Sequence, residues 1–175
     1  MVRLGDTVNT DDKVRNPPEE RHSDPRRQVI QIEKMIPHPN YTSEPKPLND
    51  IALLRLSTNV EFRSGAVLPI CLPIGIFGDN GNLIGRRASV AGWGMTKTGK
   101  SSADLLHTSV PIRDISDCTG SLSAEAHMCA GGDEDGGDSC RGDSGSPLTL
   151  NELVQGELKA VQIGISSYGD IFCGT

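Results

Sequence analysis

The sequence has few aromatic residues, no long apolar stretch and no excess of basic charge. Aromatic side chains make up 3% of the 175 residues, so a core must be filled mainly by Val, Ile and Leu. The longest apolar stretches are short pieces such as residues 51–54, far from the roughly 20 residues of a membrane-spanning helix, so we expect no membrane partner. Acidic side chains outnumber basic ones by 23 to 17, which predicts no nucleic-acid partner.

The cysteines lack the Cys-x-x-Cys spacing of a zinc knuckle or a redox motif, so we expect no metal centre built from them. An odd number leaves one thiol over if the others pair, and four cysteines allow three pairings that the sequence does not separate. The chain is therefore either an oxidised secreted domain with one intermolecular bridge or a domain with buried free thiols. No signal peptide is visible in residues 1–6. The cysteines are Cys71, Cys118, Cys129, Cys140 and Cys173.

Short strand-like segments separated by turn residues dominate the chain. Residues 6–27 are polar and contain three prolines, which favours a surface loop. Asp114 can begin a short helix by accepting a hydrogen bond from the amide of Ser116 or Asp117. Many short strands with Gly-rich turns favour an all-β barrel or sandwich. Strands are expected at residues 28–32, 51–56, 88–91, 109–113 and 158–165.

The most informative stretch runs from Gly137 to Pro147 and contains Gly142-Asp-Ser-Gly145. A serine between glycines can occupy a tight turn with its hydroxyl exposed and backbone amides turned toward it. This arrangement suits a nucleophile, because the N–H groups of Gly142 and Ser144 would stabilise the oxyanion that develops during acyl transfer. The alternative is a plain surface turn, and the surrounding residues favour catalysis.

Six segments resemble the trypsin-like (chymotrypsin-fold) serine proteases, and most closely the clip-domain members of arthropod proteolytic cascades. The resemblance implies an all-β fold of two six-stranded antiparallel β-barrels, incomplete because the first strands of barrel one and the C-terminal helix are missing. Residues 1–85 would hold the remainder of the first barrel and a linker, and residues 86–175 most of the second barrel. The segments are residues 49–56 (NDIALLRL), 68–73 (LPICLP), 90–94 (VAGWG), 128–132 (MCAGG), 138–147 (DSCRGDSGSP) and 164–169 (GISSYG).

The resemblance assigns catalytic roles to two residues. Ser144 would attack the peptide carbonyl, and Asp50 would hold the imidazole of a histidine in its productive tautomer, following the well-known template of this family. Asp50 precedes Ser144 in the chain, as the chymotrypsin-type order requires. The alternative for Asp50, without the neighbouring motifs, is an ordinary turn aspartate before a strand. Asp143 would pair with the amino terminus freed by activation, and without that cation we expect its carboxylate to find another partner or move, leaving the oxyanion hole poorly formed.

The resemblance also implies cleavage after Arg or Lys. Asp138 occupies the position at the base of the specificity pocket, where a carboxylate pairs with a buried guanidinium or ammonium of the substrate. Ser139, Ser167 and Gly169 would line the substrate site, with Gly169 keeping the pocket mouth open to a long side chain. The alternative is that Asp138 belongs to a solvated acidic loop together with residues 133–135.

By the same resemblance, Cys118 pairs with Cys129 and Cys140 with Cys173. Each bridge would close a modest loop and contribute about 2–4 kcal/mol by restricting the unfolded chain. Cys71 would then form an interchain disulfide with the light chain released on activation. The alternative is a reduced, buried Cys71.

Parts of the family pattern are absent from the sequence. There is no Ala-Ala-His-Cys segment with the catalytic histidine, so we expect the chain alone to be inactive or nearly so. The Ile-Val-Gly-Gly type of start is also missing, and the sequence stops before the final strands, which indicates a fragment. Ser146 replaces a glycine of most relatives and affects local packing. The histidines that do not match the motif are His22, His38, His107 and His127.

Three short motifs could mark sites of glycosylation, cell adhesion or calcium binding. Asn40-Tyr-Thr42 is a glycosylation sequon if the chain is secreted. Residues 141–143 spell Arg-Gly-Asp, an adhesive tripeptide that here belongs to the nucleophile loop. Residues 5–12 occupy the place of the family's calcium loop, but the carboxylates are too few for the six to eight oxygens of calcium, so no cofactor is expected and calcium is an alternative. These carboxylates are Asp6, Asp11 and Asp12.

The sequence therefore predicts a secreted, trypsin-like serine endopeptidase that cleaves proteins after Arg or Lys in an extracellular cascade. Its partners would be those protein substrates, an upstream activating protease, inhibitors such as serpins and a light chain held through Cys71. The alternative is a non-catalytic protease homologue that acts as a binding or regulatory module. Retention of Ser144, Asp50 and Asp138 favours the enzyme.

Overall fold

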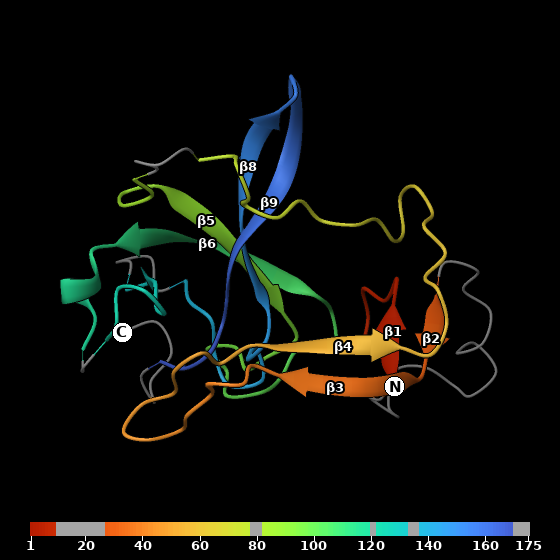
Figure 1. Cartoon of the computed structure of the whole chain (residues 1–175), viewed down its shortest axis with the longest axis horizontal. Coiled ribbons are helices and arrows are strands. Elements are labelled where there is room, and N and C mark those ends of the chain that lie inside the picture. The colour runs from red at the N-terminus through yellow and green to blue at the C-terminus, as the bar shows by residue number, and fades with distance from the viewer. Residues whose placement is uncertain (10–26, 78–81, 120–121, 133–136, 170–175) are drawn as a thin grey trace.

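The computed structural model describes residues 1–9, 27–77, 82–119, 122–132 and 137–169 (Figure 1). The chain is nearly all-β, which confirms the expected class, and its strands pair antiparallel. Within the described residues the sheets do not close into barrels, and no helix there is long and apolar enough to cross a bilayer. The elements are β1 (Val2–Leu4), β2 (Gln28–Ile30), β3 (Ile32–Pro37), β4 (Ala52–Leu56), β5 (Arg87–Gly92), β6 (Leu106–Arg113), the 3-10 turn η2 (Ile115–Asp117), β7 (Cys129–Ala130), β8 (Pro147–Val154) and β9 (Glu157–Ile165).

A five-stranded sheet in the order β7-β6-β5-β8-β9 forms the larger part of the fold. The β8–β9 hairpin extends beyond the other strands, as its upper end in Figure 1 shows. Its two-residue turn, Gln155-Gly156, has positive φ at both positions (54° and 83°). Positive φ at both central residues is the type I′ geometry that matches the twist of a tight hairpin, and glycine adopts it without strain.

One face of the five-stranded sheet carries the core. Ala88, Ile112 and Leu150, on three neighbouring strands, form a buried cluster that is completed by half-buried Phe77 and Leu83. Along β5 the burial alternates between neighbouring residues, which is the period of a strand with one covered face. The core is therefore built by aliphatic residues with little aromatic contribution, as the composition indicates.

The two remaining strand pairs, β1–β2 and β3–β4, bury much less apolar surface. Met35 on β3 and Leu53 on β4 are 69% and 67% exposed. The segment around Cys71 connects these strand pairs to the large sheet. It lies parallel to β9, and the carbonyl of Cys71 accepts a hydrogen bond from the amide of Gln162 at 2.9 Å. The apolar packing of the chain is thus concentrated in residues 77–165.

Two local expectations need correction. The strand expected at residues 28–32 is interrupted at Gln31, and β3 continues to Pro37. Strand β8 was not expected at all, although it lies between β5 and β9. The polar pair Asn151-Glu152 breaks the apolar alternation along β8, so its sequence lacks the usual strand pattern.

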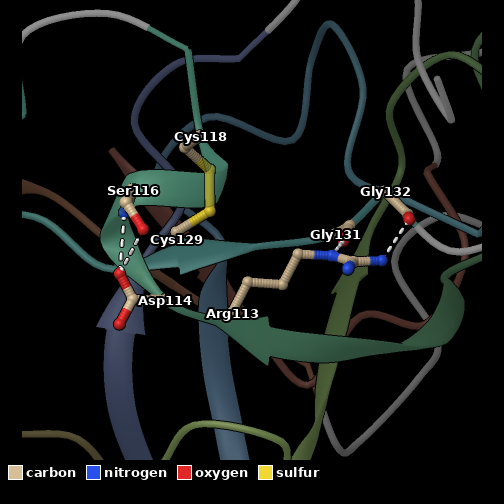
Figure 2. The surroundings of a disulfide bond; sticks show 7 residues. All are labelled: Arg113, Asp114, Ser116, Cys118, Cys129, Gly131 and Gly132. Atoms are coloured by element: carbon tan, nitrogen blue, oxygen red, sulfur yellow. Dashed lines mark hydrogen bonds between the residues drawn. A yellow bond between two sulfur atoms is a disulfide. The ribbon is translucent and has the colours of Figure 1, made fainter.

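The short helix expected at Asp114 is the single 3-10 turn η2. The Asp114 carboxylate accepts hydrogen bonds from the amide of Ser116 at 2.9 Å and from its hydroxyl at 2.6 Å (Figure 2). These bonds hold the pKa of Asp114 below its ordinary value, because they stabilise the ionised carboxylate. Ser116, rather than Asp117, is therefore the residue that Asp114 caps.

Leu150 is 4% exposed, and Leu153 on the same strand is 73% exposed, so Leu153 is an exposed control for a substitution of Leu150. We expect Leu150→Ala to lower the free energy of unfolding by about 2–5 kcal/mol, because it removes buried methylenes and leaves a cavity. Leu153→Ala should change it by less than about 0.5 kcal/mol. Urea unfolding, followed by the fluorescence of the single tryptophan Trp93, measures both; equal effects would place the core elsewhere.

Candidate active site

The nucleophile loop, defined as residues 137–146, leads into β8. Ser144 is exposed, and the glycines on either side of Asp143-Ser144 have positive φ, 99° at Gly142 and 86° at Gly145. Among the described residues, the amides of Gly142 and Ser144 donate no backbone hydrogen bond. The loop therefore leaves both N–H groups free to bind an oxyanion.

The carboxylate of Asp143 is turned into the protein and is held by backbone amides. It accepts the N–H of Gly94 at 2.8 Å and the N–H of Cys140 at 3.0 Å. A Cβ at Gly92 or Gly94 would lie 1.9 or 2.5 Å from the Asp143 side chain, so both positions require glycine. No cation pairs with Asp143 in the part of the chain that the structure describes. The partners of this half-buried carboxylate are thus two peptide groups.

The nucleophile loop is joined to the segment after β9 by two backbone hydrogen bonds. The amide of Gly145 donates to the carbonyl of Ser166, and the amide of Ser166 donates to the carbonyl of Ser146, both at 2.8 Å. The next residue, Ser167, donates its hydroxyl to the carboxylate of Asp50 at 2.5 Å. Through Ser166 and Ser167, these hydrogen bonds link Asp50 to the loop that carries Ser144.

Asp50 lies at the end of a loop that folds back before β4. Thr42 and Leu48 exchange two backbone hydrogen bonds, and the side-chain amide of Asn49 donates to the carbonyl of Asn40 at 2.9 Å. Asn49 has φ 52°, a left-handed conformation that asparagine tolerates better than most residues. The contributions of Asn49 and of the Ser167 hydroxyl to the position of Asp50 were not foreseen, although Asn-Asp before a strand is a turn signal.

Asp138 is half-buried against a glycine backbone. Its carboxylate accepts the amide of Ser139 at 2.7 Å, and a Cβ at Gly131 would approach it to 2.9 Å. Arg113 fixes this glycine segment, because its guanidinium donates to the carbonyl of Gly131 at 2.6 Å and to the carbonyl of Gly132 (Figure 2). Asp138 thus has fixed contacts with the backbone, unlike a residue of a solvated loop. Its acidic neighbours at 133–135 lie outside the described residues.

Cys118 and Cys129 form a disulfide beside η2 and the Arg113 contacts (Figure 2). Cys140 is also disulfide-bonded, while Cys173, its expected partner, lies outside the described residues. Cys71 carries a free, half-buried thiol. The nucleophile loop therefore has a covalent anchor at Cys140, four residues before Ser144.

The described histidines make their hydrogen bonds to residues other than Ser144 and Asp50. His38 accepts the amide of Asn40 in a turn, and His107 lies on β6 opposite Ala91. His127 contacts the carbonyl of Pro47 at 2.7 Å through Nε2. None of these three is hydrogen-bonded to Ser144 or Asp50 among the described residues, and His22 lies outside them.

The minor motifs take ordinary structural positions. Asn40 is exposed. In the Arg-Gly-Asp tripeptide the Asp143 carboxylate points inward, so the tripeptide does not present its acid to a receptor. Asp6 lies between the guanidinium groups of Arg3 and Arg27 at 3.5 and 3.4 Å, and these positive charges oppose cation binding. The described residues contain no cluster of three acidic, His or Cys side chains, and Asp11 and Asp12 fall outside them.

Comparison with known proteins shows the family of the chain. The family model described as Trypsin matches residues 6–175. The chain belongs to the trypsin family. Among its relatives are insect proteins: "Melanization protease 1" of Drosophila melanogaster is 41% identical over 82% of this chain, and "Phenoloxidase-activating factor 3" of Holotrichia diomphalia is 38% identical over 100% of it. "CLIP domain-containing serine protease B4" of Anopheles gambiae is 36% identical over 83%.

These relatives confirm the resemblance to insect clip-domain serine proteases. The chain spans 37% of the length of the Drosophila protein, 50% of the Holotrichia protein and 41% of the Anopheles protein. The matched part of this trypsin-family chain includes the nucleophile loop and the segments that contact it.

The close approach of Gly94 to Asp143 predicts the effect of a single methyl group. We expect Gly94→Ala to lower the free energy of unfolding by about 1–3 kcal/mol, because the added Cβ displaces the carboxylate from its two amide donors. Gly164→Ala is the control, since its Cβ would lie 3.5 Å from Leu148, an ordinary contact. That change should be neutral or stabilising by about 0.4–1 kcal/mol. Urea unfolding distinguishes the two, and a neutral Gly94→Ala would contradict the assigned contact.

Proposed function

We propose that this chain carries the nucleophile, the orienting aspartate and the specificity carboxylate of a serine endopeptidase that cleaves proteins after Arg or Lys. Ser144 attacks the carbonyl, the amides of Gly142 and Ser144 hold the oxyanion, and Asp50 orients a histidine. The observation that supports this most strongly is the hydrogen bond from the Ser167 hydroxyl to Asp50. Ser167 is the next residue in the chain after Ser166, which pairs with the nucleophile loop.

The substrate class follows from Asp138. This half-buried carboxylate is fixed by the amide of Ser139 and by close contact with Gly131, so its charge lies in a defined place with reduced hydration. Ser139 and Ser166 lie next to each other, with their hydroxyl oxygens 3.5 Å apart, and so connect this carboxylate to the segment that pairs with the nucleophile loop. A guanidinium or ammonium of the substrate is the group that such a carboxylate binds.

Histidine is the part of the machinery that we expect this chain not to supply. Without a general base near Ser144 the hydroxyl keeps its proton, so the chain binds substrate and cleaves it slowly or not at all. The proposed setting is that of a secreted cascade protease with protein substrates, an activating protease and inhibitors such as serpins. Cys71, free and half-buried, is the proposed attachment point for a light chain.

Binding tests the substrate class independently of turnover. An acetylated tripeptide amide that ends in Arg should bind the chain more tightly than the same peptide that ends in Gln. We expect Asp138→Asn to weaken binding of the Arg peptide about 10- to 100-fold, because a charge-assisted hydrogen bond is lost. Asp117→Asn, an exposed carboxylate on η2, is the charge-matched control. Equal binding of both peptides, measured by calorimetry, would refute the assignment of Asp138.

Turnover tests the missing base. We expect the chain to hydrolyse an Arg-nitroanilide no faster than its Ser144→Ala variant, while both bind the Arg peptide equally. Hydrolysis well above background that disappears in Ser144→Ala would show that one of the chain's own histidines serves as the base. The proposal of a chain that binds without cleaving would then be wrong.

A further inference from the structure

Lys46 lies beside the candidate active site with its charge unpaired. Its ammonium nitrogen is 5.2 Å from the centre of the Tyr168 ring, and the side chain is half-buried. No carboxylate pairs with it among the described residues. An ammonium over an aromatic face is attracted by the ring, yet that contact leaves its charge available to an anion.

His127 holds this group in place without adding a charge. The amide of Ser123 donates to Nδ1 of His127 at 3.0 Å, so Nε2 carries the ring proton and donates to the carbonyl of Pro47 at 2.7 Å. The His127 ring also meets Tyr168 edge-on, with centroids 5.7 Å apart. Burial raises the pKa of Tyr168, so its phenol stays neutral. Lys46 is therefore the single formal charge of this cluster.

The cluster is built on the two segments that form the candidate active site. Lys46 and Pro47 precede Asp50 by a few residues, and Tyr168 directly follows Ser167, whose hydroxyl is bonded to Asp50. The carboxylate of Asp50 is already engaged by that hydroxyl. A peptide whose carbonyl lies at Ser144 and whose upstream residues extend along this segment would reach Tyr168, since each extended residue adds about 3.3 Å.

We propose that Lys46, over the ring of Tyr168, binds an acidic side chain of the substrate that lies two to four residues upstream of the cleaved Arg or Lys. A glutamate or aspartate there supplies the counterion that Lys46 lacks, and its methylenes pack on the aromatic ring. This inference rests on the proposed function, because it needs the peptide to be held at Ser144 and Asp138. It adds a second charge requirement, opposite in sign to that of Asp138, and so narrows the substrate class.

The test compares peptides that differ by one charge. Acetylated peptide amides ending in Arg carry either Glu or Gln at one position, two, three or four residues before the Arg, and their binding is measured by calorimetry. We expect Glu to bind about 3- to 10-fold tighter than Gln at one position, the range of a partly solvated ion pair. Lys46→Gln should abolish this preference while the Gln peptide still binds as before.

Three further variants make the result specific. Lys159→Gln on β9 removes the same charge seven residues before Ser166 and should keep the preference for Glu. Tyr168→Phe should also keep it, and Tyr168→Ala should reduce it, because the ring supports the ammonium.

The possible failures are distinguishable. If Arg peptides bind in an Asp138-dependent manner but Glu and Gln are equal at every position, or if the preference survives in Lys46→Gln, the acidic subsite is refuted and the proposed function stands. If no Arg peptide binds, or Asp138→Asn has no effect, the proposed function fails and the acidic subsite fails with it.

Discussion

The paired backbone hydrogen bonds between Ser166 and the nucleophile loop are the contact on which the rest of the site depends. They continue the β8–β9 ladder before the first residue of β8 and past the last residue of β9, so the end of the loop is held as firmly as the sheet itself. Ser167 and Tyr168 follow at once, and they reach Asp50 and Lys46. A backbone ladder is well suited to this task because each amide and carbonyl has one partner and one geometry.

The loop itself is organised around a half-buried carboxylate. Asp143 accepts two amides, and the glycines at 92 and 94 leave the space that it occupies. A carboxylate in such a place is tolerated only when it is well bonded, because desolvation of an unpaired charge is costly. Among the described residues the neighbouring amides of Gly142 and Ser144 make no internal backbone hydrogen bond, as the proposed oxyanion site requires.

Charge is distributed unevenly around the nucleophile. Asp138 offers a negative group, beside the Gly131 backbone that Arg113 holds, and Lys46 offers a positive group next to Pro47, whose carbonyl contacts His127. The two charges lie on segments that both adjoin residues 166–168. Under the proposed function, a substrate with opposite charges at a fixed spacing would satisfy both, and this would favour it over substrates that carry one of the charges.

Much of the local structure could be predicted, because it is determined by residues that are close together in the sequence. Glycines at 142 and 145 permit positive φ wherever the chain places them, and Asp114 caps a turn two residues away. Strand β8 could not be predicted from its pattern, since Asn151 and Glu152 break the alternation and only pairing with β5 and β9 stabilises it.

The sequence by itself determined the all-β class, the turn that exposes Ser144 and the set of residues able to act as nucleophile, orienting acid and specificity carboxylate. Only the tertiary structure decided which of them meet. Ser167 and Asp50 are 117 residues apart in the chain, and the Lys46–Tyr168 contact spans a similar separation. Neither contact leaves a local signal, because each arises when two loops are carried to the same place by packing of the strands that precede and follow them.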